Sequence, residues 1–280
     1  MTMLDDRPTT TASFLWLDIT RMCNLACAHC YNGSGVGGEH GSMQREDWLK
    51  VIDQASAAGV RMVQLIGGEP TMHPNFAELV NHALGLGLKV EVYSNLTHIR
   101  PEWWELFQHE GVSLATSYYS DDSAEHNAVT GRQSHHKTRA SVARAVELGI
   151  PLRTGVIHLF PDQRVSQAQA DLSSLGVKNI GTDRMRHFGR GQGSHTACDV
   201  NELCGRCGDG VAAIGPNGDV SPCIMSTWMT AGNVRVSPLS VILAGAEMAD
   251  FAALIPKAAD PCDPTVNPCR PDAYPCQPQA

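Results

Sequence analysis

The sequence has no hydrophobic run that approaches the roughly 18 apolar residues of a membrane-spanning helix. It also lacks a basic start, because Asp5 and Asp6 stand where a signal peptide would carry positive charge. Positive charge is scarce throughout: 21 Lys and Arg face 29 Asp and Glu, which gives a formal net charge of -8. These features argue against a membrane protein, a secreted protein and a non-specific nucleic-acid binder. We therefore expect a cytoplasmic protein.

Cysteine is absent from a long central stretch, and this gap divides the chain. None of the 10 cysteines lies between Cys30 and Cys198. In a reducing compartment, clustered cysteines indicate metal or redox chemistry before disulfides. We predict a cysteine-poor body with a metal site at its mouth, followed by a cysteine-rich extension. The candidate metal ligands are Cys23, Cys27, Cys30, Cys198, Cys204, Cys207, Cys223, Cys262, Cys269 and Cys276.

The body alternates buried-strand patterns with amphipathic-helix patterns six times. Such alternation favours a parallel sheet with helices outside it. Roughly 180 residues are too few for the ~250 of a complete eight-unit barrel, so the expected fold is α/β, an open partial (β/α)6 TIM barrel. The expected domains are a disordered N-terminus at 1–12, a core at 13–190 and an extension at 191–280. Strands are expected at 14–19, 63–66, 89–94, 112–118, 152–159 and 179–186, and helices at 45–58, 75–86, 101–110, 136–148 and 165–175.

Polar and thiol residues follow the expected strands at their carboxyl ends. In parallel barrels the chemistry lies at these ends, in the loops that follow the strands. The three N-terminal cysteines follow the first strand, and a Gly-Gly-Glu-Pro segment at 67–70 follows the second. Ser94 and Asn95 follow the third strand, and Tyr118 and Tyr119 follow the fourth. The sequence therefore predicts one functional rim.

The first cysteines form a CxxxCxxC motif, C-N-L-A-C-A-H-C, at residues 23–30. Three thiolates on one short loop suit an iron–sulfur cluster that takes its fourth ligand from elsewhere. Zinc is the alternative, although structural zinc usually takes four protein ligands in paired spacing. His29 lies between the cysteines rather than in a separate histidine pair. The loop alone favours the cluster and leaves zinc open.

Together with the GGEP segment, this motif resembles the radical SAM enzymes. The resemblance implies that Cys23, Cys27 and Cys30 bind three irons of a [4Fe–4S] cluster, while S-adenosylmethionine (SAM) chelates the fourth. It also implies reductive cleavage of SAM to methionine and a 5′-deoxyadenosyl radical, which abstracts a hydrogen atom from the substrate. A flavodoxin- or ferredoxin-type protein would donate the electron.

The resemblance also assigns SAM-contacting positions. The GGEP motif contacts the methionine amino group, and Ser94-Asn95 matches a ribose-contacting position, although Ser-Asn is also a common turn. Ile157 matches an adenine-contacting position or is a core residue. Arg184, with Arg186 and Arg190, binds a carboxylate or is solvated charge. The implied SAM-binding residues are Gly67, Gly68, Glu69, Pro70, Ser94, Asn95, Ile157 and Arg184.

The extension contains a CxxC pair, Cys204 and Cys207, followed by a hairpin pattern that leads to Cys223. This arrangement resembles the SPASM or twitch extension of radical SAM enzymes, which holds auxiliary [4Fe–4S] clusters. It implies one cluster on these thiols with a tail cysteine, and possible use of Cys198 and the remaining thiols for a second. The tail cysteines depart from the family spacing, so a tail with spare thiols and a zinc ribbon stay open as alternatives.

Three residues beyond the fourth strand are candidates for catalysis: Tyr118, Tyr119 and His126. One of them could serve as an acid, a base or a radical relay, and the alternative is a role in loop packing. A Ser/His/Asp triad or a carboxylate pair is not needed, because a radical cofactor carries the difficult chemistry.

The resemblance implies maturation of a ribosomally made peptide by a thioether, a C–C crosslink or side-chain oxidation. Many such relatives carry a peptide-recognition domain before the barrel, which this chain has no room for, so a separate recognition protein is expected. The alternative is a dehydrogenase, decarboxylase or rearrangement enzyme that acts on a sugar or nucleoside. A non-catalytic zinc protein is the third possibility. Neither nucleic acid nor a membrane is expected as a partner.

Overall fold

The computed structural model describes residues 12–193 and 198–257. The N-terminus that we expected to be disordered lies outside these ranges except for Ala12, which is buried. Cys262, Cys269 and Cys276 also lie outside the described residues. Within the described ranges, no helix has both the length and the apolar character needed to cross a membrane.

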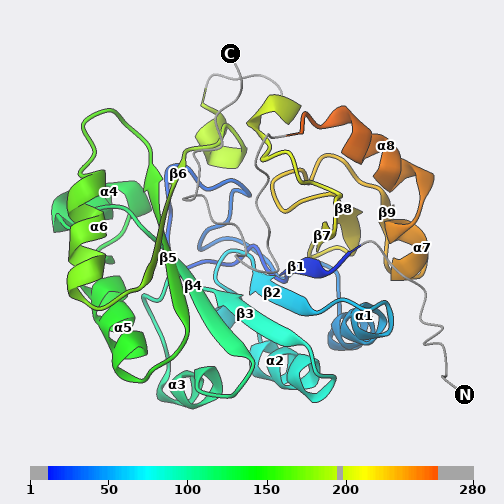
Figure 1. Ribbon diagram of the computed structural model, residues 1–280, viewed down its shortest axis with the longest axis horizontal. Coiled ribbons are helices and arrows are strands. Elements are labelled where there is room, and N and C mark those ends of the chain that lie inside the picture. Colours follow the sequence, from blue (N-terminus) through cyan, green and yellow to red (C-terminus); the bar gives the residue numbers. More distant parts are fainter. Residues whose placement is uncertain (1–11, 194–197, 258–280) are drawn as a thin grey trace, which may run out of the picture.

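One nine-stranded sheet organises the described residues (Figure 1). Its strand order is β6-β5-β4-β3-β2-β1-β7-β8-β9. Strands β1 to β6 are parallel to their neighbours, which confirms the predicted α/β fold with a partial barrel. The bounds are β1 Phe14–Asp18, β2 Met62–Ile66, β3 Lys89–Tyr93, β4 Val112–Tyr118, β5 Leu152–His158, β6 Asn179–Arg184, β7 Val211–Ile214, β8 Asp219–Ser221 and β9 Gly232–Asn233.

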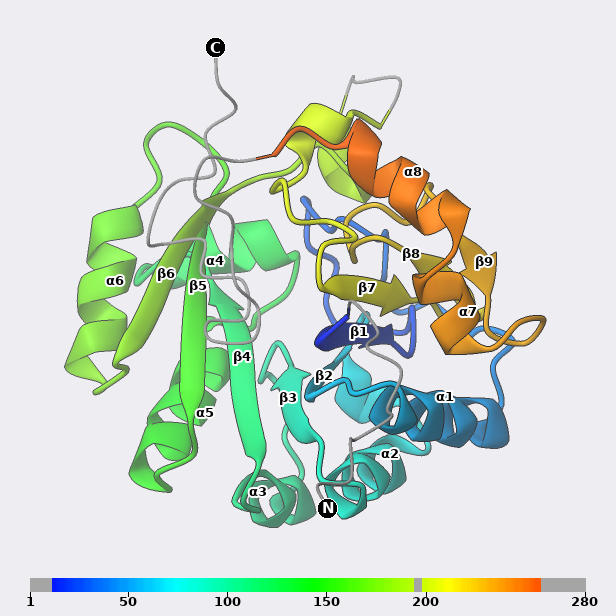
Figure 2. The same cartoon turned by 45° about the vertical axis from the view of Figure 1, so that its right-hand side comes forward.

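Helices follow the first five strands and cover the outer side of the curved sheet (Figures 1 and 2). The two helices α7 and α8 belong to the extension. Short 3-10 turns lie at Pro70–Met72, Gly189–Gln192 and Val200–Glu202. The helices are α1 Arg45–Ala57, α2 Phe76–Gly85, α3 Pro101–Phe107, α4 Ser123–Thr130, α5 His135–Glu147, α6 Val165–Ser174, α7 Leu239–Leu243 and α8 Ala246–Leu254.

Strand β1 is buried on both faces, and its alternating side chains enter two different cores. Leu15 and Leu17 belong to the large core between the sheet and its helices. Phe14 and Trp16 point to the opposite face, where they join a second core with extension residues such as Val211. The continuous apolar pattern of this strand therefore reflects burial by the barrel helices on one face and by the extension on the other.

The extension continues the sheet of the barrel beyond β1. Strand β7 pairs with β1 in parallel, with Leu15 opposite Ala212, and β8 then pairs with β7 in antiparallel orientation. The predicted hairpin is confirmed. The parallel pairing of β7 with β1 was not predicted, because nothing in a four-residue apolar strand specifies its partner. It places the extension beside the strand that leads into the first cysteines (Figure 2).

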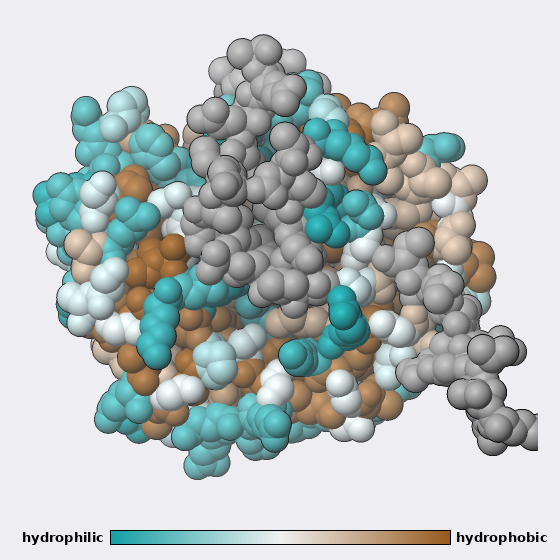
Figure 3. All heavy atoms as spheres, viewed as in Figure 1, coloured by the Kyte–Doolittle hydropathy of each residue, from teal (hydrophilic) through white to brown (hydrophobic). Residues whose placement is uncertain are grey.

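The helices that cover the sheet expose mainly hydrophilic side chains to solvent. On the face shown in Figure 3, hydrophilic side chains dominate the left and lower margins, where α3, α5 and α6 lie in the matching view of Figure 1. Hydrophobic atoms show between these helices and the sheet. The helices therefore present their apolar sides inward, as amphipathic covering helices do.

Candidate active site

The first three cysteines lie in a loop that leaves β1, and we call residues 23–34 the thiol loop. The loop is fixed by its backbone: Cys23 N–H donates to Gly35 O at 3.0 Å. Ala26 N–H and Ala28 N–H donate to Thr130 O and Val129 O, both at 3.0 Å. These two acceptors belong to α4, a helix that the sequence did not predict. The carboxyl end of helix α4 therefore holds the thiol loop through two backbone hydrogen bonds.

The glycines after β2 lie directly against the start of the thiol loop. A Cβ atom on Gly68 would lie 2.2 Å from Met22 O and 2.9 Å from the Cβ of Cys23. One on Gly67, whose φ is 155°, would lie 2.4 Å from Thr20 O. Any larger residue would push these loops apart, so both glycines are required for the close approach.

Glu69 is buried and fully engaged within the protein. Its Oε1 accepts hydrogen bonds from the hydroxyls of Thr71 at 2.7 Å and Ser94 at 2.9 Å. Its Oε2 accepts from Asn95 N–H at 2.9 Å. Burial raises the pKa of this carboxyl, and the hydrogen bonds oppose that shift. Glu69 thus joins the loops after β2 and β3.

A cavity of about 260 Å³ opens at the carboxyl ends of the strands. It brings most predicted site residues together, from both the barrel and the extension. Glu69, Pro70, Tyr118 and Cys207 are not among its lining residues. The predicted residues that line it are Cys23, Cys27, Cys30, Gly67, Gly68, Ser94, Asn95, Tyr119, His126, Ile157, Arg184, Cys204 and Cys223.

Burial favours the neutral forms of two thiols and two imidazoles at the cavity. Burial raises the pKa of the Cys23 thiol to about 11 and that of Cys27 to about 12. Burial also lowers the pKa of His126 to about 3 and that of His29 to about 4. The Nδ1 atoms of both histidines are buried without a hydrogen-bond partner. The two imidazoles flank the ring of Tyr119, at centroid distances of 5.0 Å for His29 and 5.3 Å for His126.

His29 also lines the cavity, which was not predicted, because from the sequence it was weighed only as a zinc ligand. Its position between two thiols of the motif was the available signal. Gln64 on β2, Tyr93 on β3 and Arg153 on β5 were also missed, and they line the cavity from the barrel interior. Arg153 forms a buried ion pair with Glu91 at 2.7 Å.

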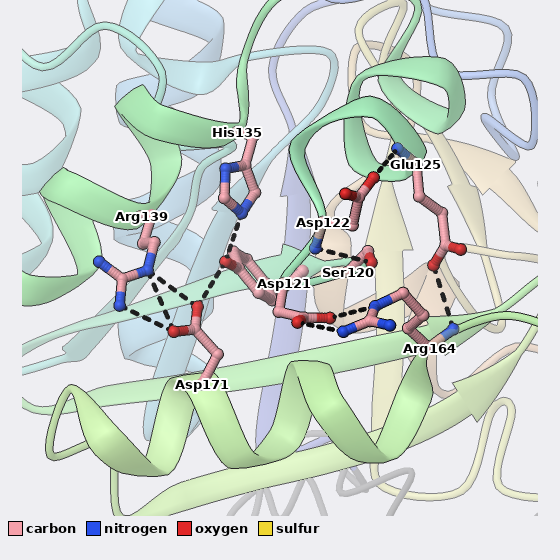
Figure 4. Close-up of polar contacts among 9 residues, drawn as sticks. Ser120, Asp121, Asp122, Glu125, His135, Arg139, Arg164 and Asp171 are labelled. Carbon is pink, nitrogen blue, oxygen red and sulfur yellow. Dashed lines mark hydrogen bonds and ion pairs between the residues drawn. The ribbon is translucent and has the colours of Figure 1, made fainter.

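Tyr118 lies outside the cavity in a separate polar network. Its hydroxyl donates to Asp171 Oδ2 at 2.8 Å and lies 2.9 Å from His135 Nε2. Because the carboxylate accepts the phenolic proton, His135 Nε2 carries the proton in the second contact. Arg139 pairs with Asp171 at 2.7 Å, as Figure 4 shows beside the separate pair of Asp121 and Arg164. This network ties β4 and α5 to α6.

Three extension thiols are gathered near the cavity. Cys207 is buried between Cys204 and Cys223, and its hydrogen bonds with both thiols raise its pKa. Cys204 and Cys223 line the cavity, whereas Cys198 is exposed. In the part of the chain that the structure describes, no group of three or more His, Cys, Asp or Glu side chains is arranged to hold a single metal ion.

The arginine that ends β6 and the two arginines that follow it have different partners. Arg184 pairs with Glu202 at 2.7 Å, and Arg186 pairs with Asp183 at 2.8 Å. Arg190 instead contacts backbone carbonyls of the thiol loop. All three line the cavity.

The thiol loop and the two glycines occupy the region that a family comparison recognises. The sequence model of the radical SAM superfamily matches residues 17–173. The chain belongs to the radical SAM superfamily. A second model, for the iron–sulfur cluster-binding SPASM domain, matches residues 204–270. Both resemblances found in the sequence are therefore confirmed, and the two matches imply [4Fe–4S] clusters and SAM as cofactors.

Two curated relatives are named as a peptide cyclase and as a maturation protein. The chain is 26% identical over 191 residues to the PqqA peptide cyclase of Bradyrhizobium diazoefficiens, covering 64% of this chain and 50% of the cyclase. It is 34% identical over 188 residues to the sporulation killing factor maturation protein SkfB of Bacillus subtilis, covering 66% of this chain and 45% of SkfB. The chain thus spans about half the length of these relatives.

Solved structures share the fold at low sequence identity. Streptococcus suis SuiB bound to the precursor peptide SuiA superposes with a TM-score of 0.75 at 16% identity, over 87% of this chain and 67% of SuiB. The protein anSMEcpe with bound AdoMet gives a TM-score of 0.67 at 15% identity, over 87% of this chain and 83% of that chain. BtrN in complex with AdoMet and 2-DOIA gives 0.58 at 15% identity, over 89% of this chain and 88% of BtrN.

The residues at the cavity fit the cofactors of the superfamily. Three soft thiol donors line the same cavity as Gly67 and Gly68, whose lack of a Cβ lets the loop after β2 lie against the thiol loop. Cys23, Cys27 and Cys30 would hold the cluster, and the loops after β2 and β3 would face SAM. Metal binding requires thiolates, so assembly displaces the protons that burial holds on these thiols. The bound cofactors would supply a primary carbon radical that removes a hydrogen atom from the substrate.

Proposed function

We propose that this radical SAM protein matures a ribosomally synthesised peptide, by forming a thioether or C–C crosslink or by oxidising a side chain. The observation that carries the proposal is that thiols from the barrel and thiols from the extension line one cavity. Abstraction of a hydrogen atom leaves a substrate radical. Formation of the new bond then requires loss of one electron and one proton, and a redox centre on the extension thiols lies where it could accept that electron.

The peptide assignment is supported by the relatives that the chain resembles. One relative is named a peptide cyclase, SkfB is named a maturation protein of the sporulation killing factor, and the solved structure of SuiB contains the precursor peptide SuiA. The chain spans about half of the first two. We extend the peptide substrate to this chain as part of the proposal.

The site assignments belong to the proposal as well. We assign Cys23, Cys27 and Cys30 to the SAM-cleaving cluster and Cys204, Cys207 and Cys223 to an auxiliary cluster. We also assign residues 13–190 to the core and residues 191–280 to the auxiliary domain. We further propose oxidoreductase chemistry in the cytoplasm, a flavodoxin- or ferredoxin-type electron donor and a separate peptide-recognition protein.

The test is anaerobic co-expression with a short peptide encoded beside the gene, followed by mass spectrometry of the peptide. A crosslink or dehydrogenation removes two hydrogen atoms from the peptide. The matched control is the triple variant Cys23→Ala, Cys27→Ala and Cys30→Ala, which should leave the peptide unmodified. Purified wild-type protein should also release 5′-deoxyadenosine from SAM under reduction.

A small-molecule substrate is the second candidate. The observation that favours it is the fold similarity to BtrN, of which this chain covers 88% and whose structure holds 2-DOIA. If peptides encoded nearby stay unmodified while a sugar or nucleoside is dehydrogenated with formation of 5′-deoxyadenosine, the peptide proposal is wrong and this candidate replaces it.

A further inference from the structure

All three nitrogen atoms of the Arg190 guanidinium group donate hydrogen bonds to the thiol loop. Its Nε donates to Cys27 O, its Nη1 to Gly33 O and its Nη2 to Ser34 O, each at 2.8 Å. Its backbone N–H donates to Cys30 O at 2.9 Å. One residue thus holds four carbonyl groups of the thiol loop, including those of two of its cysteines.

The residues on either side of Arg190 are glycines that allow this contact. A Cβ on Gly189, whose φ is 54°, would lie 2.4 Å from Cys30 O and 2.3 Å from Tyr31 O. A Cβ on Gly191 would lie 2.7 Å from Arg186 O and 3.2 Å from His29 O. The backbone at 189–191 therefore lies directly on the thiol loop, and the arginine is held in place from both sides.

The charge of Arg190 is directed at the thiol loop rather than at a carboxylate. Arg184 and Arg186 are paired with Glu202 and Asp183. None of the ion pairs found among residues 12–193 and 198–257 includes Arg190. A cluster on the thiol loop gains negative charge when it is reduced, and net charge and hydrogen bonding set the reduction potential of such clusters.

We propose that Arg190 is a positioning residue that fixes the geometry of the thiol loop and raises the reduction potential of the cluster bound there. The three guanidinium contacts fix the backbone at Cys27, Gly33 and Ser34, and so hold the segment that carries Cys30 between them. The positive charge stabilises the reduced cluster, so that it accepts an electron at a less negative potential. This inference does not depend on the identity of the substrate.

The test is an EPR-monitored redox titration of the holoprotein with sodium dithionite, which supplies one electron to each cluster. The signal of the thiol-loop cluster is identified by its change on addition of SAM. Three variants are compared with wild type. Arg190→Gln removes the charge, and Arg190→Lys keeps the charge but cannot make the three hydrogen bonds to carbonyls. Arg144→Gln is the control. Arg144 is exposed on α5 and pairs with Glu147, away from the cavity.

Arg190→Gln should lower the ratio of reduced to oxidised cluster at a given potential about threefold, equivalent to about 28 mV for a one-electron couple. The shift is modest because the side chain is exposed and solvent screens part of its charge. Arg190→Lys should keep the wild-type potential but show a broadened EPR signal and lower iron occupancy. Arg144→Gln should match wild type. A wild-type potential and line shape in Arg190→Gln would overturn the proposal.

A variant that loads no iron is tested in the metal-free state. Hydrogen exchange of the backbone amides at residues 23–35 should be at least tenfold faster in metal-free Arg190→Gln than in metal-free wild type, because the loop loses the three hydrogen bonds from the guanidinium group. Unchanged exchange in a variant that has lost its iron would also refute the positioning role. Exchange in the core strands should be equal in both proteins and shows that the variant is folded.

Discussion

Glu69 and Asn95 are joined by a hydrogen bond of 2.9 Å from the backbone N–H of Asn95 to Oε2 of the glutamate. The same carboxylate accepts the hydroxyl proton of Ser94, so the loops after β2 and β3 are held by one buried side chain. Glu69 itself does not line the cavity, whereas Ser94 and Asn95 do. The structure therefore gives the glutamate a positioning task, and its contact with the methionine amino group stays a prediction.

Substitution Glu69→Gln should weaken SAM binding and lower the free energy of unfolding by about 1–3 kcal/mol. An amide replaces one acceptor oxygen by a donor, which leaves at least one buried donor of Ser94, Asn95 or Thr71 without an acceptor. Calorimetric titration of the anaerobic holoprotein with SAM measures the first effect, and urea unfolding measures the second.

The matched control is Glu78→Gln on α2. Glu78 is exposed and pairs with the exposed Arg45, so its loss should cost no more than about 1 kcal/mol and leave SAM affinity unchanged. Wild-type affinity and stability in Glu69→Gln would show that the carboxylate does not hold the two loops.

Substitution Cys207→Ala should remove iron from the extension while SAM cleavage persists. Cys207 is 3% exposed and is hydrogen-bonded to both neighbouring extension thiols. Iron counting and the yield of 5′-deoxyadenosine from anaerobic protein measure the two effects. The reciprocal variant Cys23→Ala should retain the extension iron and release no 5′-deoxyadenosine. Full iron content in Cys207→Ala would exclude this thiol as a ligand.

The sequence predicted the barrel strands and the rim because both leave local patterns. Apolar runs alternate with amphipathic ones, and the thiol and glycine motifs follow strands β1 and β2 directly. Helix α4 was missed because it is short and has a weak apolar stripe, with three buried residues among eight. Its start is nevertheless visible in Asp122, whose side chain caps Glu125 N–H at 2.9 Å.

The direction of the side chain decides which of two neighbouring tyrosines belongs to the cavity, and the sequence alone does not show that direction. Tyr118 ends β4 and points to the helices, while Tyr119, one residue later, lines the cavity. Neighbouring residues of a strand point to opposite faces, so only one of the pair could enter the cavity. Which one does so depends on the register of β4 in the sheet. The hydrogen bonds of Arg190 to the thiol loop likewise join segments that are more than 150 residues apart in sequence, so no local pattern predicts them.

Substitution Tyr118→Phe should destabilise the protein by about 1–3 kcal/mol without abolishing SAM cleavage. The lost hydroxyl leaves His135 Nε2–H without its acceptor and Asp171 without one donor. Thermal unfolding and the rate of 5′-deoxyadenosine formation measure the two effects. Asp121→Asn is the control, because its pair with Arg164 is solvent-exposed and contributes little. Loss of SAM cleavage with unchanged stability would instead place Tyr118 in the chemistry.

Buried neutral histidine should make the protein less stable as the pH falls below about 6.5. Burial lowers the pKa of His126 to about 3, so the folded protein leaves this imidazole uncharged. An unfolded chain protonates it near pH 6.5. Between these values only the unfolded state binds the proton, and the free energy of unfolding therefore falls as the pH drops through this window.

Substitution His126→Gln should reduce the loss of stability between pH 7.5 and pH 5.0 by about 2 kcal/mol, the linkage expected for one histidine over that interval. Urea unfolding of anaerobic protein at the two pH values measures the difference. His136→Gln removes an exposed histidine from α5 and should keep the wild-type difference. If His126→Gln loses as much stability on acidification as wild type, the imidazole of His126 is already protonated in the folded protein. The hypothesis that His126 is a neutral base at the cavity would then be wrong.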